Sequence, residues 1–491
     1  MTAVRRVENF VGGVRRPPCD GAYMDVTQPT TGLLLARIPV STKADVDAAV
    51  AAAKAALPAW RRLTCKARAA KLRALHALIE QHADALADLV VLESGKTKPE
   101  ALAGLAKGNE TCDWAIGLPA HLAGRCQTVS RGVACRDQLE PVGVVASIAP
   151  FNFPFMVPFW TTPIALACGN CVVLKPSEKC PLTMDYVATL LQEAGFPDGV
   201  FSLVHGARAA VEALCDAPDV GALTFVGSSP VAELVYHRCS ARNKKCLALG
   251  GAKNHLVAMP DCDVAMAAAD IAASFTGCAG QRCMAASVLL TVGTNAPLLE
   301  ALVRTAGALT PGVGAGNVGA VIDGAAQSRI LQCIDEAEAG GATILLDGRP
   351  WADAEDGFWV GPTILLHTNA ADAALHEEIF GPVLSVLVVD DKEAALRVEN
   401  ASPYGNAACV YTSAGGTAQW FADRFLAGMI GVNIGVPVPR EPFTFGGRDG
   451  TRSKFGAHDV TGEGAMRFFT TRRKVTTKWQ AAVGPPDKAQ F

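Results

Sequence analysis

The sequence predicts an α/β protein built from a Rossmann-like unit, a second α/β unit and a small β arm. Three observations predict this arrangement. From residue 142 short apolar runs alternate with helical stretches, a second alternating series begins near Asn254, and two segments of rough polar/apolar alternation, 127–141 and 465–479, belong to neither series. The 491 residues suit two to four domains of roughly 150 residues each.

The composition limits the classes of function. Half of the residues are hydrophobic and 19% are charged, which supports a large core and excludes global disorder. The 44 basic and 47 acidic residues give 44 − 47 = −3, and no polybasic tract is present, so we expect neither nucleic-acid nor membrane binding. The apolar runs end before the roughly 18 residues that a membrane span needs.

The cysteines and the N-terminus indicate a reducing compartment. The 16 cysteines are scattered and make up only about 3% of the chain, which disfavours a disulfide scaffold. No apolar stretch follows Arg5 and Arg6, as a secretory signal requires, and Glu8 and Asp20 make a poor transit peptide. We therefore expect a protein of the cytoplasm or the mitochondrial matrix.

Helices are predicted before the first α/β series. Thr42 and Asp45 have the spacing of a capping box, and an alanine-rich helix follows them to about Leu57. Residues 66–93 repeat apolar positions at spacings of three and four, which predicts one amphipathic helix that ends at Gly95.

The first α/β series predicts βαβ units in a buried parallel sheet, whose ligands bind at the carboxyl ends of the strands. Its predicted strands are Val142–Ile148, Cys171–Leu174, Val200–His205, Ala222–Val226 and Cys246–Leu249, with helices near 155–168, 182–194, 208–215 and 229–239.

The second series and the outlying segments complete the predicted organisation. The two outlying segments favour strands that pair between subunits, and a local hairpin is an equal alternative. The second series has predicted strands at Leu256–Met259, Ala286–Val292, Ile344–Leu346, Val383–Val389 and Ala408–Tyr411.

The segment from Thr276 to Met284 carries a candidate nucleophile. Cys283 follows a glycine-rich turn at the start of an apolar strand, and backbone N–H groups and Arg282 there would favour the thiolate. A small core residue is the alternative for this cysteine. Cys278 and Cys283 could also pair or bind metal, but no second Cys or His pair lies at zinc spacing, so we expect no metal site.

Polar residues follow the first two predicted strands. Asn152, between two prolines, is a candidate oxyanion donor, with a helix cap as the alternative. Lys175 could hold a ribose or phosphate oxygen, and Glu178 could accept hydrogen bonds from a ribose diol and repel a 2′-phosphate. A surface Lys–Glu pair is the alternative for these two residues.

Glycines follow the later strands of the same series. Gly206 ends one strand, and Gly227 and Ser228 precede a predicted helix whose positive end suits a phosphate. The usual dinucleotide fingerprint G-x-G-x-x-G is absent from this region.

Taken in order, these segments resemble the aldehyde dehydrogenase superfamily. The resemblance implies the fold of that family, with an NAD-binding domain at 1–125 and 142–250, a catalytic domain at 251–445 and an oligomerisation arm at 126–141 and 464–482, in a homotetramer or homodimer. The motifs are PFNFP at 150–154, LKPSE at 174–178, FVGS at 225–228, LGG at 249–251, GQRC at 280–283, EEIFGPV at 377–383 and FGG at 445–447.

The resemblance also implies roles for single residues. Cys283 would attack the aldehyde carbonyl, and Asn152 with the backbone N–H of the cysteine would hold the oxyanion. The cofactor-binding residues that it implies are Ile148, Phe151, Lys175, Glu178, Gly206, Gly227, Ser228, Gly250, Glu378 and Phe380.

One departure from the family pattern predicts how the acyl enzyme is released. Hydrolytic members carry L-E-L-G-G, whose Glu activates water, whereas this chain has Ala248 at that place. A methyl group accepts no proton, so we expect slow thioester hydrolysis and acyl transfer to a thiol such as coenzyme A. The alternatives are hydrolysis with Glu377 or Glu93 as the base, and a non-catalytic homologue.

Four further strings resemble the CoA-acylating methylmalonate-semialdehyde dehydrogenase family of valine catabolism. They are GAKNH at 251–255, RCM at 282–284, FNFPFMVPFW at 151–160 and VPVP at 436–439. This resemblance implies NAD-dependent oxidation of methylmalonate or malonate semialdehyde to propionyl-CoA or acetyl-CoA with loss of CO2.

The same resemblance implies two cations for the substrate carboxylate. Arg282 matches one of the two arginines of that family, with a structural salt bridge as the alternative. Lys107 stands where the second arginine is expected, and it keeps the charge but loses the bidentate fork. The exact acidic aldehyde therefore stays open.

Overall fold

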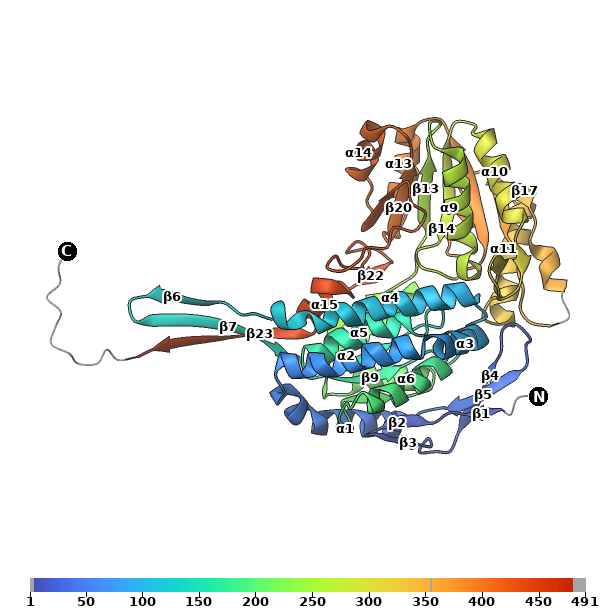
Figure 1. The fold of residues 1–491 in the computed structure, drawn as a ribbon. Helices are drawn as coiled ribbons and strands as arrows, with labels where there is room; N and C mark the ends of the chain where they lie inside the picture. Colours follow the sequence, from blue (N-terminus) through green and yellow to red (C-terminus); the bar gives the residue numbers. More distant parts are fainter. Residues whose placement is uncertain (1–3, 354–355, 480–491) are drawn as a thin grey trace, which may run out of the picture.

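The computed structural model describes residues 4–353 and 356–479. Two large sheets form the body of the molecule, and a narrow β arm extends away from it (Figure 1). Residues 480–482 of the predicted arm lie outside the described residues, as do residues 1–3. No described helix has both the length and the apolar character that a membrane span requires.

The first sheet has eight strands and a parallel centre. Its order is β22-β12-β11-β8-β9-β10-β2-β3, so β9 and β11 flank β8 on opposite sides and open a crevice at the carboxyl ends. The central strands are β8 (Val144–Ile148), β9 (Cys171–Lys175), β10 (Phe201–Leu203), β11 (Val220–Val226) and β12 (Lys245–Leu249), with β2 (Asn9–Val11), β3 (Val14–Arg16) and β22 (Lys454–Phe455) antiparallel at the edges.

Eight helices that precede residue 241 share one hydrophobic core with this sheet. The predicted helices between the strands are confirmed as α5 to α8. The helices are α1 (Lys43–Arg62), α2 (Cys65–Gln81), α3 (Ala83–Ser94), α4 (Lys98–Ile116), α5 (Met156–Ala167), α6 (Leu182–Glu193), α7 (Arg208–Asp216) and α8 (Ser229–Ser240).

Two helix predictions were wrong in their bounds. Helix α1 continues through Pro58 to Arg62, because buried Trp60 packs in the core and donates its indole N–H to the Leu166 carbonyl. The predicted single helix 66–93 is two helices, broken at His82, whose ring lies 2.9 Å from the Tyr186 hydroxyl. Both differences arise from contacts more than 100 residues away in sequence.

The second sheet is also parallel except at one edge. Its order is β17-β18-β19-β14-β13-β20-β21, and the predictions missed β18 and β21. The strands are β13 (Asn254–Ala258), β14 (Ala286–Val292), β17 (Thr343–Leu346), β18 (Thr363–His367), β19 (Val383–Val389), β20 (Ala407–Tyr411) and β21 (Met429–Val432). The helices around it are α9 (Val264–Thr276), α10 (Ala296–Gly307), α11 (Gly324–Ala339), α12 (Ala373–His376), α13 (Lys392–Asn400) and α14 (Gly415–Ala422).

The two outlying segments pair with each other. Strand β7 (Val133–Pro141) lies between β6 (Cys126–Ser130) and β23 (Thr470–Lys478), and together they form the arm. The strand-like prediction for 465–479 was wrong at its start, because α15 (Gly462–Phe468) occupies it and packs into the core.

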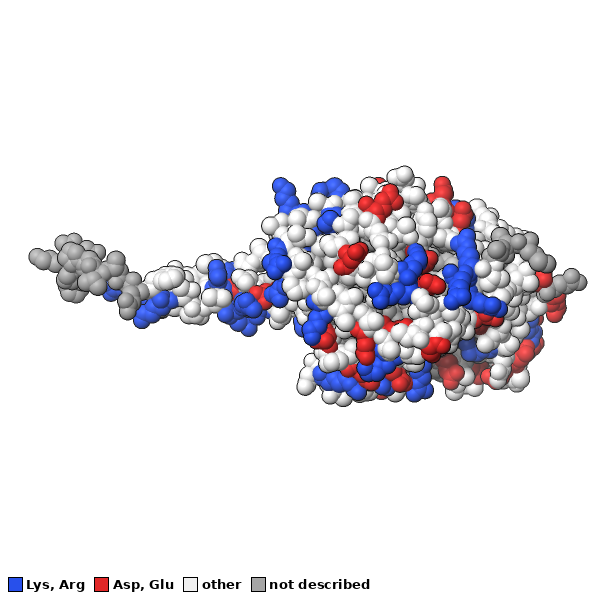
Figure 2. Space-filling model, turned by 90° about the horizontal axis from the view of Figure 1, so that it is seen from below, with Lys and Arg blue, Asp and Glu red and all other residues white. Residues whose placement is uncertain are grey.

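Figure 2 shows basic and acidic side chains interleaved over the face in view.

Smaller elements complete the fold. They are a three-stranded sheet of β1 (Arg5–Arg6), β4 (Tyr23–Thr27) and β5 (Leu34–Pro39), a short pair of β15 (Thr310–Pro311) and β16 (Asn317–Val318), and the 3₁₀ turns η1 (Leu118–Ala120), η2 (Gly277–Gly280) and η3 (Arg349–Asp353).

Glu93 stabilises the junction between α3 and α6. Its fully buried carboxylate accepts the backbone N–H groups of Leu182 and Thr183 at 2.6 and 3.1 Å. These N–H groups belong to the first turn of α6 and have no partner within the helix. We expect Glu93→Ala to lower the free energy of unfolding by about 3 kcal/mol, because two buried donors lose their acceptor.

Chemical denaturation followed by circular dichroism measures this loss. Glu80→Ala is the control, because the Glu80 side chain is 66% exposed and its replacement should change stability by less than about 0.5 kcal/mol. Equal stability of the two variants would contradict the assigned role of Glu93.

Candidate active site

A cavity of about 1370 Å³ lies where the carboxyl ends of the first sheet meet loops of the second. Residues from both sheets line it, so neither sheet forms the site alone. The predicted site residues that line it are Ile148, Phe151, Asn152, Lys175, Glu178, Gly227, Ser228, Gly250, Cys283, Glu378 and Phe380, whereas Gly206, Arg282 and Lys107 lie outside its wall.

Lys175 and Glu178 form an ion pair at the end of β9. The Lys175 ammonium donates to the Pro176 and Gly206 carbonyls at 2.7 and 2.8 Å and to Glu178 at 3.2 Å. Its three protons are therefore engaged within the protein. Burial would raise the pKa of the Glu178 carboxyl, but Lys175 and Lys179 outweigh it and keep this pKa below its usual value. Glu178 consequently presents a negative charge to the cavity.

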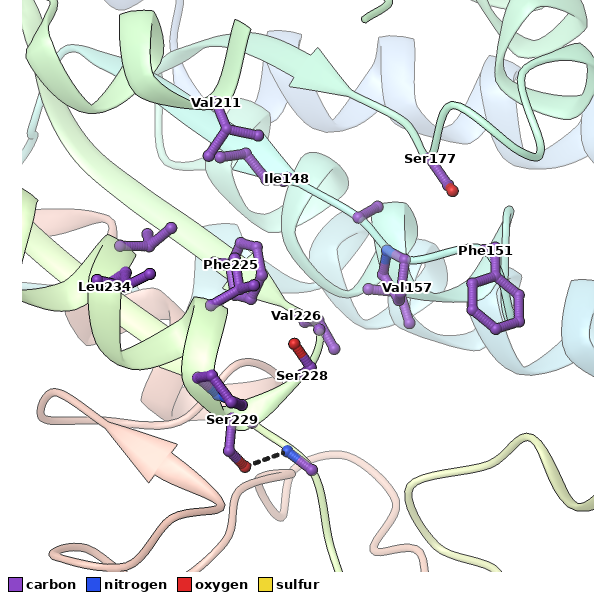
Figure 3. Close-up of a pocket in the computed structure, with 18 of the residues that line it drawn as sticks. Ile148, Phe151, Val157, Ser177, Val211, Phe225, Val226, Ser228, Ser229 and Leu234 are labelled. Atoms are coloured by element: carbon purple, nitrogen blue, oxygen red, sulfur yellow. Dashed lines mark hydrogen bonds between the residues drawn. The ribbon is translucent and has the colours of Figure 1, made fainter. Parts of the chain in front are cut away.

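The N-terminus of α8 faces the same cavity. Ser228 is the N-cap residue but its side chain makes no capping hydrogen bond, so the first N–H groups of α8 remain open to a ligand. A Cβ on Gly227 would lie 2.6 Å from the Phe225 ring, so only glycine fits at this position. Figure 3 shows Ile148, Val211, Phe225 and Leu234 along the apolar wall beside this terminus.

Cys283 is held by its backbone on a strained loop. Cys278 and Ala279 have φ values of 55° and 52°, in the left-handed region that non-glycine residues rarely adopt. The side-chain amides of Asn254 and Asn406 each donate to the Cys283 carbonyl at 2.8 Å. Neither asparagine was predicted from the sequence, because the only signal is a polar residue at, or directly before, the start of a buried strand.

The environment of Cys283 keeps its thiol protonated in the protein alone. Burial and the nearby Glu378 carboxylate raise the pKa of this thiol to about 12. Backbone N–H groups and Arg282 act in the opposite direction but do not outweigh them. The predicted thiolate-favouring effect of Arg282 is present and is insufficient by itself.

Asn152 is buried beside the cysteine loop. One amide N–H donates to the Gln281 carbonyl at 2.8 Å, and the second remains for an acceptor in the cavity. The alternative role as a helix cap was wrong, because Phe155 is the N-cap residue of α5. Asn152 therefore has the placement of an oxyanion donor.

Glu378 reaches across from the second sheet to the turn after β12. Its carboxylate accepts the Ala252 N–H at 2.9 Å, and a Cβ on Gly251 would overlap it. Phe380, two residues later, has a φ of 56° and packs edge-to-face on Phe151 at 5.9 Å. The strained loop thus places Glu378 and Phe380 on one side of the cavity.

No carboxylate stands at position 248. Ala248 is fully buried in β12, between Phe225 of β11 and Phe455 of β22, and it does not line the cavity. Glu93, in α3 against the start of α6, is also outside the cavity, although burial raises its pKa to about 7. Glu377 does line the cavity, and the carboxylate whose charge acts on Cys283 is Glu378.

The two predicted substrate cations have different surroundings. The Arg282 guanidinium donates to the Ala273 and Ser274 carbonyls at 2.6 and 2.8 Å, and no described carboxylate forms an ion pair with it. Lys107 is instead paired with Glu441 at 2.9 Å and Glu110 at 3.0 Å. The negative charge beside Lys107 was not predicted from the sequence.

Comparison with known proteins settles the family. The model of the aldehyde dehydrogenase family matches residues 17–475. The chain belongs to the aldehyde dehydrogenase family. Its resemblance to that family and its fold are therefore confirmed, whereas the exact domain limits and the roles of single residues stay predictions.

Three relatives of this aldehyde dehydrogenase are informative. It is 41% identical to malonate-semialdehyde dehydrogenase 2 of Geobacillus kaustophilus, over 97% of this chain and 100% of the relative. The crystal structure of methylmalonate-semialdehyde dehydrogenase from Oceanimonas doudoroffii is similar with a TM-score of 0.95 at 39% identity, covering 98% and 99% of the two chains. A Sinorhizobium meliloti protein described as a methylmalonate-semialdehyde dehydrogenase, solved with NAD, has a TM-score of 0.96 at 34% identity over 98% and 100%.

The raised pKa of Cys283 predicts how this aldehyde dehydrogenase reacts with iodoacetamide. Only the thiolate is alkylated, so without cofactor the rate at Cys283 should rise about tenfold per pH unit from pH 7 to 10 and reach no plateau. Mass spectrometry of the Cys283 peptide measures this rate, with the exposed Cys126 peptide of the same digest as a reference. A plateau below pH 9 would contradict the protonated thiol.

Proposed function

We propose that this chain is a CoA-acylating, NAD-dependent dehydrogenase of malonate or methylmalonate semialdehyde. The observation that carries the acylating part is Ala248, a buried methyl group at the position of the family's hydrolytic base. The names of the relatives in Geobacillus and Oceanimonas support the substrate. Loss of CO2 would make acetyl-CoA or propionyl-CoA the product.

The cavity suits NAD by several independent features. The uncapped N-terminus of α8 offers N–H groups to a phosphate, and the apolar wall at Val211 and Leu234 suits an adenine ring. The charged Glu178 suits a ribose diol and disfavours the 2′-phosphate of NADP. The NAD in the Sinorhizobium structure supports this assignment, and NAD would supply the acceptor for the hydride.

The protein residues would act in a fixed order. The Cys283 thiolate attacks the aldehyde carbon, and the free amide N–H of Asn152 stabilises the oxyanion of the thiohemiacetal. Loss of hydride then leaves a thioester on Cys283. The substrate carboxylate leaves as CO2, the resulting enolate takes up a proton, and the thiol of CoA displaces the cysteine.

We assign the substrate carboxylate to Arg282, the residue that the family resemblance implies for this role. Arg282 directly precedes the nucleophile Cys283 in the sequence. Backbone carbonyls at the end of α9 hold its guanidinium, which has no acidic partner in the described chain. Lys107 shares the same charge, but Glu441 and Glu110 compensate it. We therefore assign carboxylate binding mainly to Arg282.

Hydrolysis remains a second candidate because Glu378 acts on Cys283 electrostatically. Burial raises the pKa of the Glu378 carboxyl, which makes it a better proton acceptor than an exposed glutamate. If water reaches the thioester, this carboxylate could activate it. The fate of the acyl group therefore has to be measured directly.

Subunit assembly is proposed from the arm. Both edge strands, β6 and β23, expose most of their residues, and the arm that they flank extends away from the body (Figure 1). Open strand edges pair readily with another chain, which supports a homodimer or homotetramer.

The CoA requirement predicts the products. With malonate semialdehyde and NAD, we expect one equivalent of NADH per active site without CoA, and turnover with acetyl-CoA as product once CoA is added. Stopped-flow absorbance and mass spectrometry of the products measure both. Full turnover without CoA, with free acetate accumulating, would overturn the acylating function and favour hydrolysis.

The contacts of Arg282 and Glu441 predict how substitutions at these residues change the selectivity for acidic aldehydes. Arg282→Gln should raise the KM for malonate semialdehyde about tenfold or more, because a charge-assisted contact to the carboxylate is lost. Glu441→Gln should lower that KM severalfold, because Lys107 loses its strongest competitor for an anion. Propanal, which has no carboxylate, is the control substrate.

The propanal control distinguishes a loss of carboxylate recognition from general damage to the active site. Neither substitution should change the KM for propanal by more than about twofold, since the contacts concerned need a carboxylate. Equal losses with both aldehydes would show that Arg282 only supports the cysteine loop. An unchanged KM in Glu441→Gln would show that Lys107 does not reach the substrate.

A further inference from the structure

Gln281 is a buried glutamine of the cysteine loop whose side chain the functions proposed above do not use. It is only 4% exposed. Its amide N–H donates to the Cys278 carbonyl at 3.1 Å, and its amide oxygen accepts the backbone N–H of Ile322 at 3.0 Å. Both polar atoms of this side chain therefore bind backbone, one within the cysteine loop and one on the segment before α11.

The Gln281 side chain closes a left-handed turn. Cys278, Ala279 and Gly280 have successive φ values of 55°, 52° and 70°. L-residues disfavour this region, and such a turn persists only where the surrounding structure fixes it. The Gln281 backbone N–H also donates to the Cys278 carbonyl, at 3.0 Å. The main chain and the side chain of one residue thus hold the same carbonyl.

Two further contacts restrain the turn. The Glu100 carboxylate accepts the backbone N–H of Cys278 at 2.6 Å. A Cβ on Gly280 would overlap the Gly381 carbonyl, so the turn lies directly against the loop that carries Phe380. These contacts fix the start and the middle of the turn, and the Gln281 side chain fixes its end.

The fixed end of the turn orients the Asn152 amide. The Gln281 carbonyl accepts one amide N–H of Asn152 at 2.8 Å, and the Asn152 amide oxygen has no partner among the described residues. If this carbonyl moved away, the amide could turn and present its oxygen to the cavity, where an acceptor would repel an oxyanion. The position of the Gln281 carbonyl therefore decides which side of the amide faces the cavity.

We propose that Gln281 is a positioning residue that holds the Asn152 amide with an N–H toward the oxyanion formed when Cys283 attacks the aldehyde. Gln281 does not line the cavity itself and acts through its carbonyl, which its two side-chain bonds keep in place. This inference rests on the proposed aldehyde oxidation by Cys283 and does not depend on whether water or CoA takes the acyl group.

The test compares the NADH burst with propanal, in the absence of CoA, with alkylation of Cys283 by iodoacetamide. Gln281→Met keeps the size of the side chain and removes both of its hydrogen bonds. The burst rate should fall about a hundredfold, as when one oxyanion donor is lost. Alkylation forms no oxyanion, and Asn254 and Asn406 still hold Cys283, so its rate should change less than about threefold.

Gln327→Met is the matched control. Gln327 of α11 also donates to a backbone carbonyl, that of Trp359 at 3.0 Å, and it does not line the cavity. Its burst rate should stay within about twofold of the wild type. An unchanged burst in Gln281→Met, or equal losses of burst and alkylation, would overturn the positioning role. A wild type without any burst would instead overturn the proposed aldehyde oxidation.

A double variant shows whether the effect passes through Asn152. Asn152→Ala should slow the burst about a hundredfold or more. Adding Gln281→Met should then slow it by less than about threefold, because the donor that Gln281 positions is already absent. Losses that multiply in the double variant would contradict the proposal.

Gln281→Glu serves if Gln281→Met does not fold. A carboxyl group keeps the acceptor for the Ile322 N–H, but it can donate to the Cys278 carbonyl only when it is protonated. The ratio of the burst rate in this variant to that of the wild type should therefore rise toward one as the pH falls from about 9 to about 6. A ratio that is low at every pH, or equal to one at every pH, would contradict the proposal.

Discussion

The turn between β12 and β13 is the constraint on which the site depends. It is the point where the chain passes from the first sheet to the second, and hydrogen bonds fix it from several sides. Gly250 donates to the Ser453 carbonyl at 2.9 Å, Gly251 donates to the Ser229 hydroxyl at 2.9 Å, and the Ser453 hydroxyl donates to the Gly251 carbonyl at 2.7 Å. Figure 3 shows the Ser229 bond beside the cavity. Because the turn is fixed, the Ala252 N–H and the Gly251 gap hold Glu378 in one place.

Sequence patterns predicted the framework and placed two candidate reacting residues at the cavity, because both leave local signals. Buried strands are apolar runs between turns, and Cys283 and Asn152 lie directly after such runs or turns, where ligands of α/β sheets bind. The C-terminal end of α1 and the break at His82 left no local signal. They depend on Leu166 and Tyr186, which approach only after folding.

Electrostatic partners were the least predictable part of the site. Lys107 was expected to face a substrate anion, but its partner Glu441 is 334 residues away in sequence. The Asn254 and Asn406 amides that hold Cys283 likewise come from two segments that are distant in sequence. Charge type can be read from a sequence, whereas compensation of a charge depends on which segments the fold brings together.

The charges near Cys283 also explain why one site can hold both a protonated thiol and an anionic substrate. Burial and the Glu378 charge disfavour a thiolate at Cys283, so attack on an aldehyde requires a proton acceptor for this thiol. A thiol acceptor such as CoA ionises with a pKa near 8.5, roughly seven units below water, and needs far less help from a base. Under the proposed function, a methyl group at position 248 would therefore disfavour water as the acyl acceptor more strongly than a thiol. A cation that already has carboxylate partners gains little from binding a further carboxylate, so Lys107 would contribute little to substrate affinity. Arg282 has no carboxylate partner among the described side chains, so it would favour acidic aldehydes.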